Sequence, residues 1–272
     1  MTSNALCLIA LIAVCAGCSR KSDPNPTTGC LLTKRILSAG GSTTTDVFEY
    51  DAKGILIKYT ETIASTGSAT ITKIYTLEYA NGSVSAITKV AGTTTTVATW
   101  TVDANFRVIK ITEGTSNPPA SESTYTYDGD GNLKTWTNKA GTSTITLNAV
   151  FGSGQLTSAT ADVVTAGSSS NQPFNYSNFD SKNSPYSLLA KATGQHFFIS
   201  DTNGNVNPEF LFKSNPGITE SDYRTSGGQN DHIELTFTYE YNAQNYPTRI
   251  TQTQTGSSSP PAAFTFEYSN CN

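Results

Sequence analysis

Few residues in this chain have the type and spacing that catalysis requires. The sequence holds two histidines, His196 and His232, and neither lies in a G-x-S-x-G or H-E-x-x-H pattern. It has no glycine-rich phosphate loop, and its cysteines and histidines lack the spacing of a zinc site. Its carboxylates are scattered, so a pair flanking a glycosidic bond cannot be identified. We therefore expect a non-catalytic protein without a cofactor, and keep a hydrolase as the third hypothesis.

A short acidic segment has some of the features of a calcium loop. Asp128, Asp130 and Asn132 offer oxygen ligands at the alternating spacing of the first half of such a loop. The loop glycine belongs at the sixth position, however, whereas Gly131 stands at the fourth, and Lys139 replaces the glutamate of the twelfth. A tight hairpin turn explains the same residues without a metal. We predict no metal site and keep the three oxygen ligands as weak calcium candidates.

Trp136 is the candidate ligand-binding residue. If its strand alternates strictly, Leu133 faces the core, and Trp136 lies on the opposite, wetter face with Lys134 and Asn138. An exposed indole beside polar groups suits stacking on a sugar or another flat ligand. The predicted ligand-binding set is therefore Trp136, Lys134 and Asn138. The alternative is that Trp136 packs in a second hydrophobic layer.

The N-terminus indicates export and lipidation. Residues 1–17 carry no charge and contain an apolar run that is too short for a bilayer span of about 20 residues. The run ends in Val14-Cys15-Ala16-Gly17-Cys18, which resembles a bacterial lipoprotein signal. The resemblance implies that 1–17 are removed and that Cys18 receives the lipid, which makes the membrane an expected partner. Ser19, in place of aspartate, favours the outer membrane and leaves its face open.

Two cysteines bracket the part of the chain that is expected to fold. Residues 18–29 are expected to be a lipidated tether, because their prolines and small polar side chains cannot contribute to a core. Cys30 follows the tether, and Cys271 lies one residue from the C-terminus. In an oxidising compartment we predict that these two form a disulfide. Such a bond would constrain the unfolded chain by up to about 5 kcal/mol.

Composition narrows the class of protein. Charged residues make up 14% of the chain, and the formal net charge is −4. So few Lys and Arg side chains cannot neutralise many phosphates, and we expect no nucleic-acid partner. Aromatic residues reach 10%, which is too many for a disordered chain. The abundance of threonine, tyrosine and phenylalanine favours strands over helices.

One pattern recurs along the chain. An alternating strand ends in an aromatic or apolar residue, a short turn rich in Asp, Asn and Gly follows, and a second alternating strand begins. The copies have their anchor residue at Tyr50, Tyr79, Val102, Tyr127, Phe151, Tyr241 and Tyr268. Where the series is unbroken, successive anchors are 23 to 29 residues apart. That period accommodates two strands and two turns, which predicts one β-hairpin per repeat.

The segment Tyr125 to Leu133 resembles the YD repeat of RHS-type surface proteins. The chain as a whole resembles the YD-repeat-like lipoproteins of Gram-negative bacteria. This resemblance implies a lipidated N-terminus, then a single all-β domain over 30–272, and no catalytic residues. We expect antiparallel hairpin repeats that form a large twisted or curved sheet. Between 152 and 232 the period breaks, and Pro185 with the following leucines predicts one short helix near 185–192, covering one end of the sheet.

These observations give an expected function. The chain is predicted to be a lipid-anchored outer-membrane or cell-surface lipoprotein, and a non-catalytic interaction module for a glycan or another surface ligand. The alternative is a carrier in which a curved sheet holds a lipid or another apolar ligand. Exposed aromatic side chains beside amides would favour the first function, and a continuous apolar concavity the second. Paired acids with shifted pKa values would favour a hydrolase.

Overall fold

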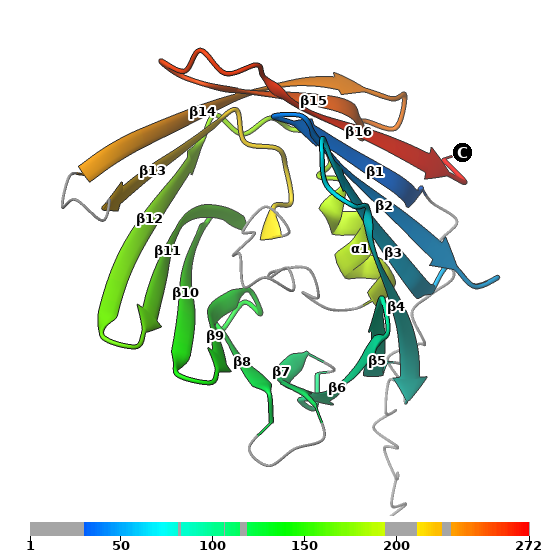
Figure 1. Ribbon diagram of the computed structural model, residues 1–272. Helices are drawn as coiled ribbons and strands as arrows, with labels where there is room; N and C mark the ends of the chain where they lie inside the picture. Colours follow the sequence, from blue (N-terminus) through cyan, green and yellow to red (C-terminus); the bar gives the residue numbers. More distant parts are fainter. Residues whose placement is uncertain are drawn as a thin grey trace, which may run out of the picture.

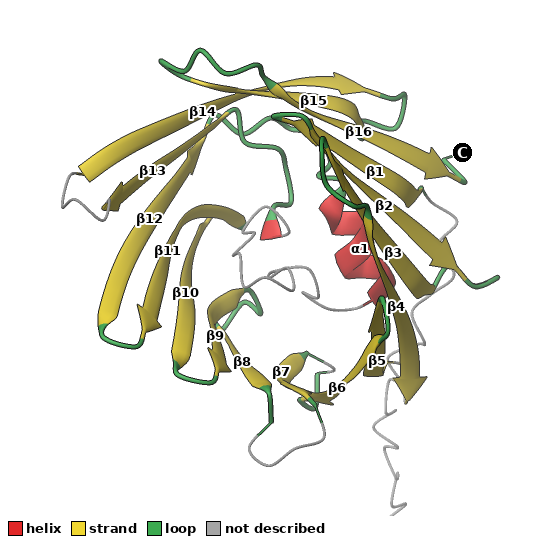
Figure 2. Cartoon of the chain, in the orientation of Figure 1, coloured by secondary structure: helices red, strands yellow, loops and turns green. Residues whose placement is uncertain are grey.

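A computed structural model describes residues 30–80, 83–105, 107–114, 119–193, 211–224 and 230–271. These residues form strands and one short helix, α1, over Tyr186–Thr193 (Figure 2). The strands are β1 Leu31–Ala39, β2 Ser42–Tyr50, β3 Leu56–Ser65, β4 Ile71–Ala80, β5 Ser83–Ala91, β6 Thr94–Val102, β7 Val108–Glu113, β8 Ser121–Tyr127, β9 Leu133–Ala140, β10 Ser143–Gly152, β11 Gln155–Thr165, β12 Ser168–Ser177, β13 Ile218–Arg224, β14 Asn230–Tyr241, β15 Pro247–Gln254 and β16 Ala262–Ser269.

The sheet closes into a barrel. Each strand pairs antiparallel with its neighbours along the chain, and β1 also pairs with β16, which joins the two edges (Figure 1). The predicted all-β class and antiparallel hairpins are confirmed. The prediction of a large twisted or curved sheet did not include closure. The sheet closes because Leu31 to Ser38 of the first strand pair with Ser269 to Ala263 of the last. The sequence of each hairpin is the same whether or not the ends meet, so the repeats alone did not predict closure.

Alternation along the strands separates an inner face from an outer face. In β14, the side chains of Leu235, Phe237 and Tyr239 alternate with those of Thr236 and Thr238. Tyr239 lies opposite Ile250, which lies opposite Phe264, and apolar and aromatic side chains form the core on the inside of the barrel. The buried aromatic members are Phe48, Tyr59, Tyr75, Trp100, Tyr125, Trp136, Tyr176, Tyr186, Phe212 and Phe266.

A β-bulge recurs in the repeats. In the β2–β3 pair, Tyr50 lies opposite Leu56 whereas Glu49 lies opposite Lys58, so that Ile57 is an extra residue. Six further pairs show the same shift, with extra residues at Ser85, Ile109, Lys134, Thr157, Thr248 and Thr33. The extra residue reverses the alternation, so that residues three apart, such as Leu56 and Tyr59, are both buried.

The β16–β1 pair is a further copy of this hairpin in which the turn is missing. Tyr268 lies opposite Leu32 and Glu267 opposite Lys34, which matches the bulged register of the other repeats. Where those repeats have a turn, this pair has the disulfide between Cys271 and Cys30. The predicted disulfide is therefore confirmed. It holds together the one hairpin of the barrel whose two strands come from opposite ends of the chain.

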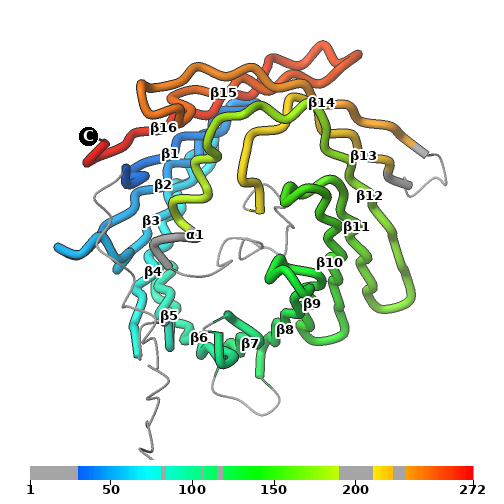
Figure 3. Tube along the Cα trace, turned by 180° about the vertical axis from the view of Figure 1, so that it is seen from behind, coloured from blue at the N-terminus to red at the C-terminus, as the bar shows by residue number. Residues whose placement is uncertain are grey.

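The break in the repeat period is a long connection within one hairpin. β12 and β13 pair like the other hairpins, but 178–217 lie between them. Ser184 and Pro185 directly precede α1, and their carbonyls accept the amides of Ser187 and Leu188 at 3.2 and 3.3 Å. The predicted helix is confirmed within one residue, but it does not cover an end of the sheet from outside. Figures 1 and 3 show α1 inside the ring of strands, and the Tyr186 ring lies 6.2 Å from that of Phe266.

Candidate functional site

The two ends of the barrel are built differently. One end holds the disulfide, the bulges and the turns that follow the aromatic positions, and we call it the repeat-turn rim. The opposite end holds the connections between successive repeats, and we call it the short-turn end. The described rim turns include 51–55, 103–107, 128–132, 153–154 and 242–246, and the short-turn end includes glycines with positive φ at 40, 41, 67, 92, 141, 167 and 256.

An acidic or amide side chain organises four of the rim turns. Asp51, Asp103, Asp128 and Asn242 each use one side-chain oxygen to accept the backbone amides two and four residues later, at 2.8–3.0 Å. In each of these turns the backbone amide of the Asp or Asn also donates to the carbonyl four residues later, at 2.9 Å. The connections after Tyr79 and Phe151 lack this residue and are one residue shorter. The aspartate of the YD pattern therefore serves the longer turn by pairing amides that would otherwise lack partners.

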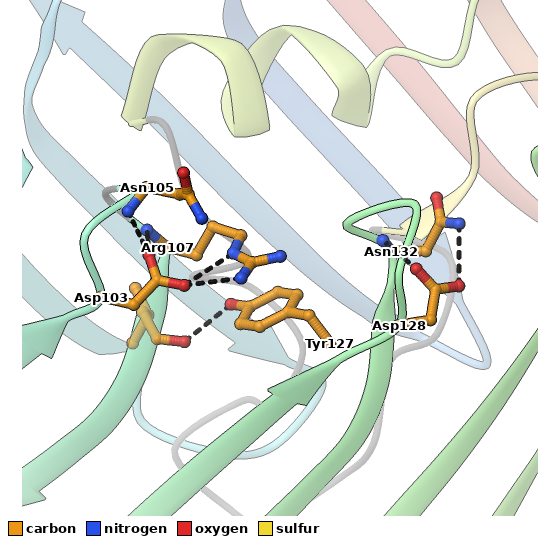
Figure 4. A network of polar contacts seen from close by, with 7 residues as sticks. Asp103, Asn105, Arg107, Tyr127, Asp128 and Asn132 are labelled. Carbon is orange, nitrogen blue, oxygen red and sulfur yellow. Dashed lines mark hydrogen bonds and ion pairs between the residues drawn. The ribbon is translucent and has the colours of Figure 1, made fainter.

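Figure 4 shows how two neighbouring rim turns contact each other. The Arg107 guanidinium donates to Asp103 of its own turn, with Nη2 to Oδ2 at 2.7 Å. Its central carbon also lies 4.6 Å from the ring centroid of Tyr127 in the next repeat. The Tyr127 hydroxyl donates to the Val108 carbonyl, which belongs to the same repeat as Arg107, at 2.7 Å. These contacts tie consecutive repeats together at the rim.

The tyrosine contact is repeated around the rim. The hydroxyls of Tyr50, Tyr79, Tyr127 and Tyr268 donate at 2.6–2.7 Å to a carbonyl in the preceding repeat. The four acceptors are the residues just before the bulges: Leu32, Leu56, Val108 and Pro247. Burial raises the pKa of all four tyrosines well above the usual value, so the hydroxyls remain donors at neutral pH. The tyrosine of the YD pattern thus links repeats.

The weak calcium candidates belong to one of these turns. Asp128 uses Oδ1 for two backbone amides and Oδ2 for the Asn132 side-chain amide at 3.0 Å. The Asn132 hydrogen bond, together with the backbone amides, holds the pKa of Asp128 below its usual range despite an opposing desolvation effect. Asp130 is exposed and contributes its backbone amide to the turn. Among the described residues no group of three or more His, Cys, Asp or Glu side chains is arranged to hold a metal ion.

The predicted exposure of Trp136 was wrong. Its side chain is 1% exposed on the inner face, opposite Tyr125. Asn138 faces the same way and donates to the Ser123 hydroxyl at 2.9 Å, whereas Lys134 is exposed. The physical reason is the bulge at Lys134, which places Leu133 and Trp136 on one face although they are three residues apart. The predicted ligand-binding set is therefore not brought together, and Trp136 packs in the core.

Charged side chains gather on the inner face of the first strands, which the sequence analysis missed. The Arg35 side chain, Nε, lies 2.6 Å from Oδ2 of Asp46, which is fully buried, and the Tyr59 hydroxyl donates to Oδ1 of Asp46 at 2.9 Å. Lys73 pairs with Glu61 at 2.7 Å on the neighbouring strands. Strand alternation could have predicted this cluster. Asp46 lies two residues from the buried Phe48 and Lys73 two residues from the buried Tyr75, so each pair shares one face of its strand.

This inner charge cluster also contacts the helix. The Arg35 Nη1 lies 3.5 Å from the Tyr186 hydroxyl, and its guanidinium lies 5.9 Å from the Tyr186 ring centroid. Burial lowers the pKa of Arg35, but Tyr186, Asp46 and Tyr59 outweigh this effect and raise it overall. Burial raises the pKa of Tyr59, and so does its neighbour Asp46. Arg35 therefore stays charged, and its contacts with Tyr186 hold α1 against the inner wall.

The two histidines do not form a catalytic group within the described part of the chain. His232 lies on the exposed face of β14, and its Nδ1 is 2.7 Å from Oδ1 of Asp222 on β13. The hydrogen bond to Asp222 raises the pKa of His232 above its usual value. His196 lies outside the described residues. The His232–Asp222 pair is an exposed cross-strand hydrogen-bonded pair.

Comparison with known proteins identifies the fold. No family model matches the chain, and no curated protein matches it. Among solved structures, a porin-like protein from Bacteroides uniformis is 14% identical, with a TM-score of 0.56, over 87% of this chain and 97% of that one. A porin-like protein from Bacteroides vulgatus is 15% identical, with a TM-score of 0.48, over 88% and 98%. The first similarity shows that this barrel fold occurs in a solved protein of nearly the same extent.

Proposed function

We propose that the protein is a lipid-anchored outer-membrane or cell-surface lipoprotein whose barrel stands in water as a non-catalytic interaction module. The observation that carries this proposal is the polarity of the outer wall. Cross-strand ion pairs lie on that wall, with Lys34 to Glu267, Lys58 to Glu49 and Lys110 to Glu122 at 2.7–2.9 Å. Threonines occupy many of the outward positions between them, as in β14 and β15.

A barrel inserted in a bilayer needs the opposite arrangement. Its outer wall carries an apolar band about 25 Å tall between aromatic girdles, and its interior is polar. Here the aromatic side chains of the described strands face inward, and the large apolar side chains that are exposed are all aliphatic. Charged side chains on a lipid-facing wall would cost about 2–4 kcal/mol each at mid-depth. The outer wall therefore suits water, and membrane attachment falls to the lipid on Cys18.

None of the described helices is long and apolar enough to cross a membrane.

A non-catalytic role is supported by how the polar side chains are used. The rim carboxylates accept backbone amides of their own turns, and the buried Asp46 is paired with Arg35 and Tyr59. These groups hold the fold together, and each of these carboxylates accepts at least two hydrogen bonds. They are therefore poor candidates for a general acid, a general base or a nucleophile.

The second candidate function is the carrier of an apolar ligand. Of the Trp, Tyr and Phe side chains whose burial the structure describes, none is exposed, which removes the expected basis for stacking a glycan on the surface. Half-buried rings instead line the inner face of the last strands, where Phe237, Tyr239 and Tyr241 stack in sequence. This inner aromatic wall favours an apolar ligand over a sugar bound outside.

Lipidation can be tested by replacing the proposed acceptor. We expect the Cys18→Ser protein to lose fatty-acid labelling and to leave the membrane fraction, because no other part of the proposed architecture attaches it there. The matched control is Cys15→Ser, which removes the neighbouring cysteine of the signal and should leave labelling intact. Labelling that persists in Cys18→Ser would refute the anchor.

The two ligand classes can be separated on the soluble domain. Residues 30–272 would be titrated with cis-parinaric acid, a fluorescent fatty acid, and applied in parallel to a glycan array. Saturable fatty-acid binding without glycan binding supports the carrier. Binding to a glycan alone would show that the interaction module uses a surface other than Trp136.

A further inference from the structure

Both ends of the folded chain leave the barrel at the same rim. β1 begins at the repeat-turn rim with Leu31, and β16 ends there with Ser269. Cys30 and Cys271 are bonded to each other at this point, with their Cα atoms 4.1 Å apart. The position of Cys30 is therefore fixed relative to the rim turns. Any chain that precedes Cys30 must start from the rim and not from the short-turn end.

The chain between Cys18 and Cys30 is short compared with the barrel. Eleven residues lie between the two cysteines, and a random coil of eleven residues would have a root-mean-square extension of about 20 Å. β3 has ten residues and connects the rim to the short-turn end, which corresponds to about 25 Å along the axis of a tilted strand. A lipid on Cys18 therefore keeps the rim close to the membrane, with the short-turn end one barrel length farther out.

The connection between β12 and β13 bridges the rim. On one side the Lys213 Nζ lies 3.4 Å from Oδ1 of Asn132, and the Gln155 side chain donates to the Ser214 hydroxyl at 2.9 Å. On the other side the Lys182 Nζ donates to Oδ1 of Asn245 at 2.6 Å. These contacts join the connection to turns of three different repeats. The hydrogen bonds of this connection thus link rim turns from both halves of the barrel.

The exposed chemistry of the rim suits a layer of lipid headgroups. Its exposed positions include Ala52, Lys53, Asn105, Asn183 and Asn245, which are small, amide or cationic side chains. The carboxylates of Asp51, Asp103 and Asp128 are turned into their own turns, where backbone amides offset their charge. Asp130 is the remaining acid of the described turns 51–55, 128–132 and 242–246 and is exposed, and the exposed cations Lys53 and Lys213 of the rim outnumber it toward an anionic bilayer.

We propose that the repeat-turn rim is the membrane-facing surface of the anchored protein, and that the short-turn end points away from the bilayer. This inference rests on the proposed lipid anchor at Cys18. It assigns the short-turn end as the part of the molecule that partners reach first. The occupant of the rim is the lipid surface itself.

The test compares two labels at opposite ends of one strand. Lys53 lies in the rim turn before β3, and Ser68 lies in the turn after it, and both are exposed. A keto-bearing residue at position 53 or 68 would be coupled to a donor dye, which leaves the cysteines untouched. The lipidated full-length product would be reconstituted into vesicles of phosphatidylcholine and phosphatidylglycerol containing a headgroup-linked acceptor. Energy transfer from each dye to the headgroups would then be measured.

We expect clearly stronger transfer from position 53, corresponding to a separation about 25 Å shorter than from position 68. Equal transfer from both positions, or stronger transfer from position 68, would overturn the orientation. If the cell-made protein does not float with vesicles, the proposed anchor fails instead. In that case residues 18–272 would be coupled through Cys18 to a maleimide lipid, and the same comparison of positions 53 and 68 would still decide the orientation.

Discussion

At the scale of single residues, the repeated side chains have structural tasks that their types explain. The YD pattern combines an aspartate that organises the rim turn with a tyrosine that binds the preceding repeat. Alternation in the sequence predicted the inward aromatic residues, and position predicted the Cys30–Cys271 bond, which the fold confirms. Trp136 was misplaced because one extra residue in a strand reverses every later side chain, and no local signal in Lys134 marks it as that residue.

The turn carboxylate can be tested where the chain offers its own control. Asp51→Ala removes the acceptor of the Lys53 and Ile55 amides and should lower the free energy of unfolding by about 1–2 kcal/mol. Asp51→Asn should cost much less, because Asn242 performs the same task in another repeat. Urea denaturation of the three proteins measures both differences. Equal losses in the two variants would show that charge, and not the amide-binding oxygen, is what the turn requires.

The tyrosine contacts between repeats predict that removing one hydroxyl lowers the stability of the barrel. Tyr79→Phe leaves the ring in place but deletes the hydroxyl that donates to Leu56 at 2.6 Å, and should destabilise the barrel by about 1 kcal/mol. Tyr246→Phe is the control, because the Tyr246 hydroxyl has no hydrogen bond among the described residues. Thermal unfolding followed by circular dichroism would compare them. Identical midpoints for both variants would argue against the link between repeats.

At the scale of elements, the hairpin repeats were predictable from the sequence, but the long connection within one hairpin was not. Strand alternation and the Asp, Asn and Gly turns predicted the hairpins, and Pro185 with the following leucines predicted the helix. The interval from 152 to 232 looked like a loss of the repeat, but it is one hairpin, β12–β13, with a long connection between its strands. Sequence pattern could not place α1, because its contacts with Arg35 and Phe266 depend on closure of the barrel around it.

The point where this connection rejoins the barrel is tightly packed. A Cβ atom on Gly217 would lie 2.9 Å from the carbonyl oxygen of Asn178, and backbone cannot move aside as a flexible side chain can. The Gly217 amide also donates to the Ser177 and Asn178 carbonyls at 3.0 Å. Gly217→Ala should therefore lower the stability by about 1–3 kcal/mol. Gly141→Ala tests a glycine with open space but positive φ, and a smaller effect of Gly217→Ala than of Gly141→Ala would contradict this packing.

At the scale of the whole molecule, the barrel is a ring of hairpins that is cut at one rim turn and closed by a disulfide. The bulged register of β16–β1 and the contact from Tyr268 to Pro247 are the same as in the uncut repeats. Closure depends on the number of strands and their tilt, which a single repeat does not encode, so the sequence predicted hairpins without predicting a barrel. The proposed function assigns membrane attachment to the lipid, because ion pairs lie on the outer wall of the described strands.

A rearranged chain tests whether the disulfide replaces a turn. The variant with Cys30→Ser and Cys271→Ser should lose up to about 5 kcal/mol of stability. A circular permutant that joins Tyr268 to Leu32 through the sequence of 51–55, with new ends between Gly92 and Thr93, should recover most of that loss without any disulfide. Denaturant unfolding under reducing conditions compares the two. A permutant no more stable than the double serine variant would show that this seam differs from the other repeats.

The most direct test of the central claim, that the barrel stands in water and is held to the membrane only by its lipid, is the behaviour of residues 30–272 without detergent. Light scattering during size-exclusion chromatography would give the mass in plain buffer, and flotation with phosphatidylcholine vesicles would report insertion. Because the outer wall carries threonines and ion pairs, we expect a monomer that stays in the aqueous fraction. Aggregation that detergent relieves, or insertion into the vesicles, would contradict the account.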